Sequence, residues 1–225
     1  NESCLSRITL LAFLLCRVSP IKYLAGYCDL MSNNLVLGDS EIRSVLRSSL
    51  SKKHAHTSRT VFIEELGLCR GQVRVDLSVV NGLLHGYEIK SDRDSFRRLR
   101  GQVELYGKVL DRATLVVGER HLDEALDNVP EWWGILLAHR SAKGLQLKTM
   151  RSPRSNPKKD PRALVELLWL DDALALLEKR DTARGFRGKA RWIVWDRVCE
   201  ICSLNEIARA VRIQLKARAK KRVPV

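Results

Sequence analysis

The spacing of hydrophobic residues predicts a chain that alternates between helices and strands and then becomes helical. Apolar side chains recur every three or four residues where a helix is expected, and in short β-rich runs where a buried strand is expected. In chain order the pattern predicts a helix at 39–50, a strand at 60–68, a hairpin at 73–90, a helix at 92–110, a strand at 113–119, a short helix at 122–129 and a strand at 132–138. This order belongs to the α/β class, with a mixed sheet.

A basic segment with three prolines, RSPRSNPKKDP, follows at residues 151–161 and cannot continue a helix or a strand. We expect it to be a linker between a domain at 31–150 and a mainly helical region at 162–225. At the start of the last predicted helix, Ser203 and Glu206 have the spacing of a capping box.

Residues 1–30 form a separate case. Their apolar run, Ile8 to Cys16, is too short to span a bilayer and has the size of a signal-peptide core. The sequence from Met31, MSNNLVLGDS, has the pattern of an ordinary start followed by a capped helix, so we favour in-frame upstream sequence over secretion. The six cysteines are scattered, as in a reduced cytoplasmic protein, and we expect a cytoplasmic location with no membrane partner.

The predicted hairpin combines a core pattern with charged residues. Odd positions are apolar on both strands, whereas Asp76, Glu88 and Lys90 occupy even positions. In an antiparallel pair the residue numbers of facing partners have a constant sum. Pairing odd with odd positions requires this sum to be even, which a three-residue loop such as Val80 to Gly82 provides and a two-residue turn does not. That register places the two carboxylates and the lysine on one face, within roughly 5 to 8 Å of one another.

A solvent-exposed face would alternate in the same way, so the pattern alone leaves two interpretations open. Two carboxylates and a lysine are also what a hard divalent cation and a phosphate require. Gln102 and Tyr106 lie four residues apart on the edge of the following helix. The net charge of +14 further indicates an anionic partner such as a nucleic acid, an anionic lipid or an acidic protein surface.

Asp76 and the string Glu88-Ile89-Lys90, in an α-β-β-β-α-β context, resemble the PD-(D/E)XK nuclease superfamily. Gln102 and Tyr106 match the Gln-x-x-x-Tyr element of RecB-type nucleases. The resemblance covers residues 39–138 and is strongest to small nuclease-like bacterial and phage proteins, similar to the VRR-NUC domain and a DNA-repair branch. The proline of the superfamily's name is replaced here by Val75.

The resemblance implies a restriction-endonuclease-like fold and a site that binds Mg²⁺ or Mn²⁺. Asp76, Glu88 and the carbonyl of Ile89 would hold the ion, and Lys90 would orient or deprotonate the attacking water and steady the phosphate. A further acidic ligand would be Glu65, which we prefer, or Glu41. Gln102 and Tyr106 would complete the catalytic set.

The implied function is hydrolysis of phosphodiester bonds in DNA by Mg²⁺-activated water. The alternative is a DNA-binding or transcription-regulatory protein of the same fold whose catalytic site has lapsed. The sequence leaves open the choice between DNA and RNA, endonuclease or exonuclease action, and a monomer or a homodimer.

Basic residues near the hairpin and in the last third of the chain are the expected nucleic-acid contacts. Residues 151–225 contain 19 Lys and Arg against 9 Asp and Glu, so most of the net charge lies there. The residues expected to contact phosphates are Arg74, Arg93, Arg97 and Arg98, together with Arg209, Arg212 and Lys216 of the last helix.

Overall fold

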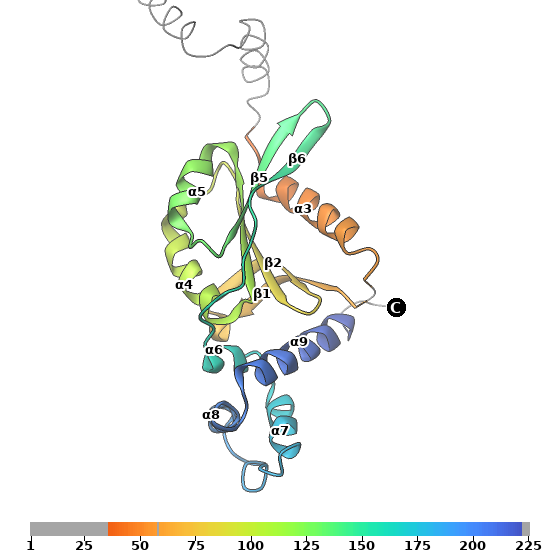
Figure 1. The fold of residues 1–225 in the computed structure, drawn as a ribbon, viewed down its shortest axis with the longest axis vertical. Coiled ribbons are helices and arrows are strands. Elements are labelled where there is room, and N and C mark those ends of the chain that lie inside the picture. The colour runs from red at the N-terminus through yellow and green to blue at the C-terminus, as the bar shows by residue number, and fades with distance from the viewer. Residues whose placement is uncertain (1–35, 58, 222–225) are drawn as a thin grey trace, which may run out of the picture. The chain divides into compact units, whose positions relative to one another are not determined.

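The computed structural model describes residues 36–57 and 59–221, which are organised around a six-stranded mixed sheet (Figure 1). The strands are β1 (Val61–Leu68), β2 (Val73–Val80), β3 (Leu84–Lys90), β4 (Arg112–Gly118), β5 (Gly134–Ser141) and β6 (Gly144–Arg151). They lie across the sheet in chain order. β3, β4 and β5 are parallel to one another, and the other neighbouring pairs are antiparallel.

Helices cover both faces of the sheet, as Figure 1 shows. α3 (Asp39–Lys53) lies on one face, and α4 (Leu99–Val109) and α5 (Leu122–Asn128) lie on the other. α4 and α5 are the crossovers between the parallel strands, which a tight turn cannot connect. The α/β class and the α-β-β-β-α-β order expected from the sequence are therefore confirmed.

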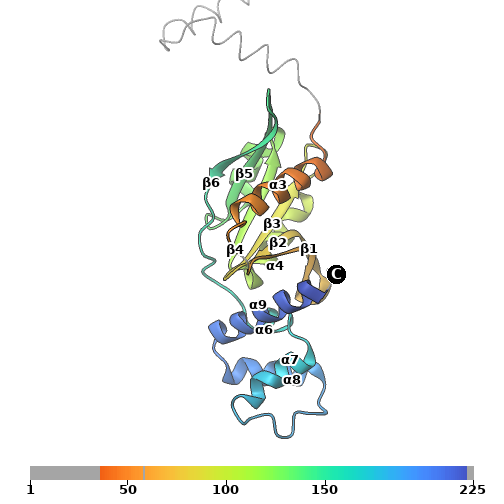
Figure 2. The same ribbon diagram turned by 90° about the vertical axis from the view of Figure 1, so that its right-hand side faces the viewer.

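The C-terminal region is helical, as expected, but it does not form a core of its own. Its helices are α6 (Pro161–Val165), α7 (Leu170–Glu178), α8 (Arg191–Ile201) and α9 (Leu204–Lys221), which Figure 2 shows grouped together, with α9 beside β1. Leu164 and Leu215 belong to the same hydrophobic cluster as Leu99 of α4. The described residues after Val36 form one compact unit, which corrects the domain boundary expected at 151–161.

A buried carboxylate joins this helical region to the sheet. Asp111, which is 8% exposed, accepts a hydrogen bond from the Leu84 amide at 2.7 Å. Its side chain also forms ion pairs with Arg212 of α9, at 3.2 Å, and with Lys159. Three segments distant in the sequence therefore depend on one side chain.

The helix expected over residues 92–110 begins later than the hydrophobic spacing indicates. The Asp94 carboxylate accepts hydrogen bonds from the amide and hydroxyl of Ser91, at 2.8 and 2.6 Å. This local turn competes with helix formation. Phe96–Arg98 then form a 3₁₀ turn, and the α-helix begins at Leu99.

The sequence reasoning also missed strand β6 and the division of the following helix. β6 carries Leu145 and Leu147 in alternation with polar residues, a pattern typical of a half-buried strand. At the start of the region expected to be mainly helical, residues 161–178 form two helices, α6 and α7, in place of a single one.

The expectation about residues 1–30 falls outside the described residues. Within residues 36–57 and 59–221, no helix combines the length and the apolar character needed to cross a membrane.

Candidate metal and nucleic-acid site

The site lies where the alternation of side chains between the two faces of the sheet is interrupted in β1 and β2. In β2, Val75 packs into the cluster beneath α4, whereas Leu77 packs into the cluster beneath α3. Asp76 lies between them, and its counterpart in β1 is Glu65, which has a left-handed φ of 50°. The expectation that all odd positions of the first hairpin strand share one face is therefore wrong at this point.

The hairpin register itself has the expected even index sum. Leu77 pairs with Tyr87 and Val80 with Leu84, across a three-residue loop that lies one residue later than expected. The next step along this ladder places Asp76 across from Glu88. Asp76 Oδ2 accepts a hydrogen bond from the Ile89 amide at 2.7 Å, which holds the carboxylate against β3.

Glu88 is only 3% exposed, and three side chains fix its carboxylate. Lys90 Nζ lies 2.8 Å from Oε1, and Gln102 Nε2 donates to the same oxygen at 2.5 Å. The Tyr106 hydroxyl lies 2.5 Å from Oε2 and also 2.5 Å from the carbonyl oxygen of Arg74. The predicted set of Glu88, Lys90, Gln102 and Tyr106 is therefore in direct contact.

Electrostatics at this carboxylate pair favours a cation. Burial first, and then the charge of Glu88, raise the pKa of Asp76 to about 6, although the Ile89 amide and Arg43 act in the opposite direction. Burial and the charge of Glu88 also raise the pKa of Tyr106, so its hydroxyl stays protonated and remains a donor. A carboxylate whose ionisation is disfavoured by burial and by a neighbouring carboxylate is stabilised by a nearby positive charge.

Arg43 of α3 supplies such a charge on the outer side of the pair. Its guanidinium lies 3.1 Å from Asp76 Oδ1, 3.2 Å from Asp39 and 3.4 Å from Glu65. Asp39 was not predicted as a site residue. The only signal for it in the sequence is the helical i, i+4 spacing of Asp39 and Arg43.

The structure distinguishes the two upstream acids that the sequence left open. Glu65 faces the same pocket as Asp76 and Glu88. Glu41 instead pairs with Arg140 of β5 at 2.7 Å and does not line that pocket. Glu65 is therefore the upstream acid that lies with the carboxylate pair.

An open pocket of about 700 Å³ collects these residues. Arg74, Arg97 and Arg98 are exposed at its wall, whereas the exposed Arg93 does not line it. The residues that line it and belong to the expected site are Glu65, Arg74, Asp76, Glu88, Ile89, Lys90, Arg97, Arg98 and Gln102.

The donors in this pocket fit a hydrated Mg²⁺ or Mn²⁺ ion. Within residues 36–57 and 59–221, no three His, Cys, Asp or Glu side chains form a complete metal cage. Mg²⁺ prefers one or two carboxylates and keeps several waters, so Asp76, Glu88 and the Ile89 carbonyl form an adequate set. The buried Gln102 Oε1 accepts no hydrogen bond from any described residue and is available to a water donor.

The basic residues expected on the last helix are placed differently. Arg209 is exposed, but Arg212 forms an ion pair with the buried Asp111 at 3.2 Å. Lys216 is half-buried, and burial together with nearby cations, Arg212 foremost, lowers its pKa. None of the three lines the acidic pocket.

Residues 34–223 match the family model described as Bacteriophage P4 protein cII. The chain belongs to this family. A curated member, protein cII of Enterobacteria phage P4, is 28% identical over 119 residues, which cover 53% of this chain and 45% of the relative. The match thus spans less than half of that cII protein. Among solved structures, a protein of unknown function from Silicibacter pomeroyi aligns with a TM-score of 0.41 and 22% identity, over 68% of this chain and 98% of the other.

Proposed function

We propose that this cII-family chain is a metal-dependent nuclease of the PD-(D/E)XK type, which hydrolyses phosphodiester bonds of DNA. One observation carries the proposal. Asp76, Glu88 and Lys90 line one pocket, and the buried Glu88 is fixed by Lys90, Gln102 and Tyr106. A hairpin that merely exposed a polar face to solvent would not bury a carboxylate and a lysine to 3% and 5% exposure.

Asp76, Glu88 and the Ile89 carbonyl would hold the ion. Mg²⁺, when bound, supplies Lewis-acid polarisation of the phosphate and makes a coordinated water more acidic. Gln102 and Tyr106 keep the Glu88 carboxylate in one orientation, because each donates a hydrogen bond to it at 2.5 Å. A ligand oxygen that is already oriented loses less conformational freedom when a cation or a substrate binds.

Lys90 would act on the scissile phosphate. Its ammonium group lies 2.8 Å from Glu88 Oε1 and lines the open pocket. A fixed positive charge at this position stabilises the negative charge that develops on the phosphate oxygens in the transition state. The exposed guanidiniums of Arg97 and Arg98 at the pocket wall would bind neighbouring phosphates.

A cleavage assay tests this function. Purified protein is incubated with single-stranded, duplex and branched DNA in Mg²⁺, in Mn²⁺ and in EDTA. We expect cleavage that requires the metal and is lost in Glu88→Gln. Glu104→Gln is the matched control, because Glu104 lies on α4 with its side chain 71% exposed and outside the pocket. Equal cleavage by Glu88→Gln and wild type would assign the activity to another site or another protein.

The contacts of Arg43 favour a second candidate, a DNA-binding protein whose site no longer binds metal. The guanidinium contacts Asp76, Asp39 and Glu65 and could replace a metal ion as their permanent counter-ion. Titration calorimetry distinguishes the two functions. A lapsed protein would bind DNA with no measurable Mn²⁺ binding, whereas a nuclease would bind Mn²⁺ in the absence of DNA.

A further inference from the structure

The segment from Lys179 to Trp192, which connects α7 to α8 and includes the first residues of α8, is strongly basic. It contains six cationic residues against a single acidic one, Asp181. All six cationic side chains belong to exposed residues. They are Lys179, Arg180, Arg184, Arg187, Lys189 and Arg191.

Interactions within the protein neutralise only part of this charge. Arg187 pairs with Glu178 at 2.7 Å, and Arg180 pairs with Glu206 of α9. In the part of the chain that the structure describes, no ion pair or hydrogen bond engages the side chains of Arg184 or Lys189. These two cations are therefore available to an anionic partner.

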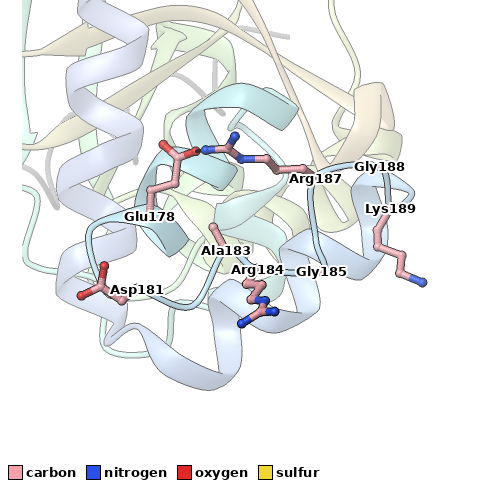
Figure 3. A pocket seen from close by; sticks show the side chains of 8 residues that line it. All are labelled: Glu178, Asp181, Ala183, Arg184, Gly185, Arg187, Gly188 and Lys189. Carbon is pink, nitrogen blue, oxygen red and sulfur yellow. Dashed lines mark hydrogen bonds and ion pairs between the residues drawn. The ribbon is translucent and has the colours of Figure 1, made fainter.

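Small residues leave this connection hollow. Ala183, Gly185 and Gly188 line a hollow of about 940 Å³ together with the charged side chains. Gly185 has a φ of +83°, a conformation that residues with a Cβ rarely adopt. Figure 3 shows the charged ends of Arg184 and Lys189 directed away from the Glu178–Arg187 pair.

An exposed tryptophan lies at the end of the same segment. Trp192, in the first turn of α8, is 57% exposed and makes no ring or cation–π contact within the described residues. The similarly exposed Trp169 differs, because the Arg218 guanidinium lies 4.6 Å from its ring centroid. A free indole face in the same segment as unpaired cations is the combination that single-stranded nucleic acids bind, with bases on the ring and phosphates on the cations.

We propose that Lys179 to Trp192 forms a binding surface for single-stranded DNA, in which Arg184 and Lys189 contact phosphates and Trp192 stacks on a base. A duplex does not fit this role, because its bases are already stacked and paired. The identity of the partner as DNA rests on the proposed nuclease function, but the binding itself requires neither a metal nor the acidic pocket.

The test measures binding of a fluorescent oligothymidine to the full chain in EDTA, across a range of salt concentrations. The double variant Arg184→Glu/Lys189→Glu should weaken binding about tenfold or more, and should reduce the salt slope by about 0.7 for each lost phosphate contact. The matched control is Lys143→Glu/Lys148→Glu, which changes the net charge equally at two exposed residues of the β5–β6 hairpin. It should retain most of the affinity and the slope.

The stacking role has its own variants. Trp192→Ala should lower the affinity for the oligothymidine about fivefold or more, whereas Trp192→Phe should restore most of it. Equal losses in the two charge-reversal variants would overturn the proposal in favour of non-specific attraction to the net charge. Binding of phosphatidylserine vesicles without binding of the oligonucleotide would overturn it in favour of a lipid surface. Absence of cleavage with this binding intact would refute only the nuclease function.

Discussion

Removal of Arg43 should strengthen metal binding, because the guanidinium and the ion compete for the same carboxylates. Arg43→Ala eliminates a cation that lies 3.1 Å from Asp76 and 3.4 Å from Glu65. If the open pocket screens charges nearly as well as water does, the repulsion between this charge and a divalent ion held by the same carboxylates would amount to roughly 1 to 2 kcal/mol. We therefore expect an affinity for Mn²⁺ that is about five- to thirtyfold higher than in the wild type.

Titration calorimetry in the absence of DNA measures this affinity. The matched control is Arg47→Ala, one helical turn further along α3, where the guanidinium lies 4.1 Å from the Phe62 ring centroid and outside the pocket. It should leave the affinity within about twofold of the wild type, as its charge is more distant and more screened. An unchanged or weaker affinity in Arg43→Ala would refute the competition between arginine and metal.

Four further outcomes follow from contacts in the site and the core. Because the pKa of Asp76 is raised to about 6, protons compete with metal below that pH, so Mn²⁺ affinity should be about tenfold or more weaker at pH 5.0 than at pH 7.5; a pH-independent calorimetric affinity would contradict this. The same raised pKa means that ionisation of Asp76 lowers the unfolding free energy of the metal-free protein as the pH rises from about 4 to 6. Thermal unfolding, measured with and without Mn²⁺, would detect this loss of stability. Tyr106→Phe leaves Glu88 and the Arg74 carbonyl without their shared donor, so the unfolding free energy in urea should fall by about 1 to 3 kcal/mol and most of the cleavage rate should be lost. A fully active variant would show that the hydroxyl does not position Glu88. Asp111→Ala leaves Lys159 and Arg212 without their carboxylate and should lower the unfolding free energy by about 3 to 5 kcal/mol, in a single unfolding transition. The control Asp127→Ala, at an exposed residue, should lower it by at most about 0.5 kcal/mol. Separate transitions for the sheet and the C-terminal helices would contradict the shared core.

Local patterns were enough to predict the elements that carry the site. The three- and four-residue spacing around Leu99 and Tyr106 identified α4, and the parity of the two hairpin strands identified the three-residue loop. The capping box of Ser203 and Glu206 was also correct, since the Glu206 carboxylate accepts from the Ser203 amide at 2.9 Å. Each of these features depends on residues close together in the sequence.

The features that were missed depend on backbone irregularities or distant contacts. The change of face at Asp76 accompanies a left-handed conformation at Glu65, and glutamate gives no sequence signal for it. The contacts of Arg43 with Asp76 and Glu65 join residues 33 and 22 positions apart. The proline-rich segment was interpreted as a linker because the pairing of Lys159 with Asp111 cannot be inferred from composition.

Single-turnover cleavage of DNA by wild type and Lys90→Ala, with DNA affinity determined on the same preparations, tests the proposed nuclease most directly. Lys90 is one of 40 Lys and Arg residues, so its loss should change DNA affinity by less than about threefold. It is also the lysine that contacts Glu88 in the pocket, so the cleavage rate in Mg²⁺ should fall by about a hundredfold or more. Undiminished cleavage by Lys90→Ala, or no cleavage by a wild-type protein that binds both Mn²⁺ and DNA, would contradict the account.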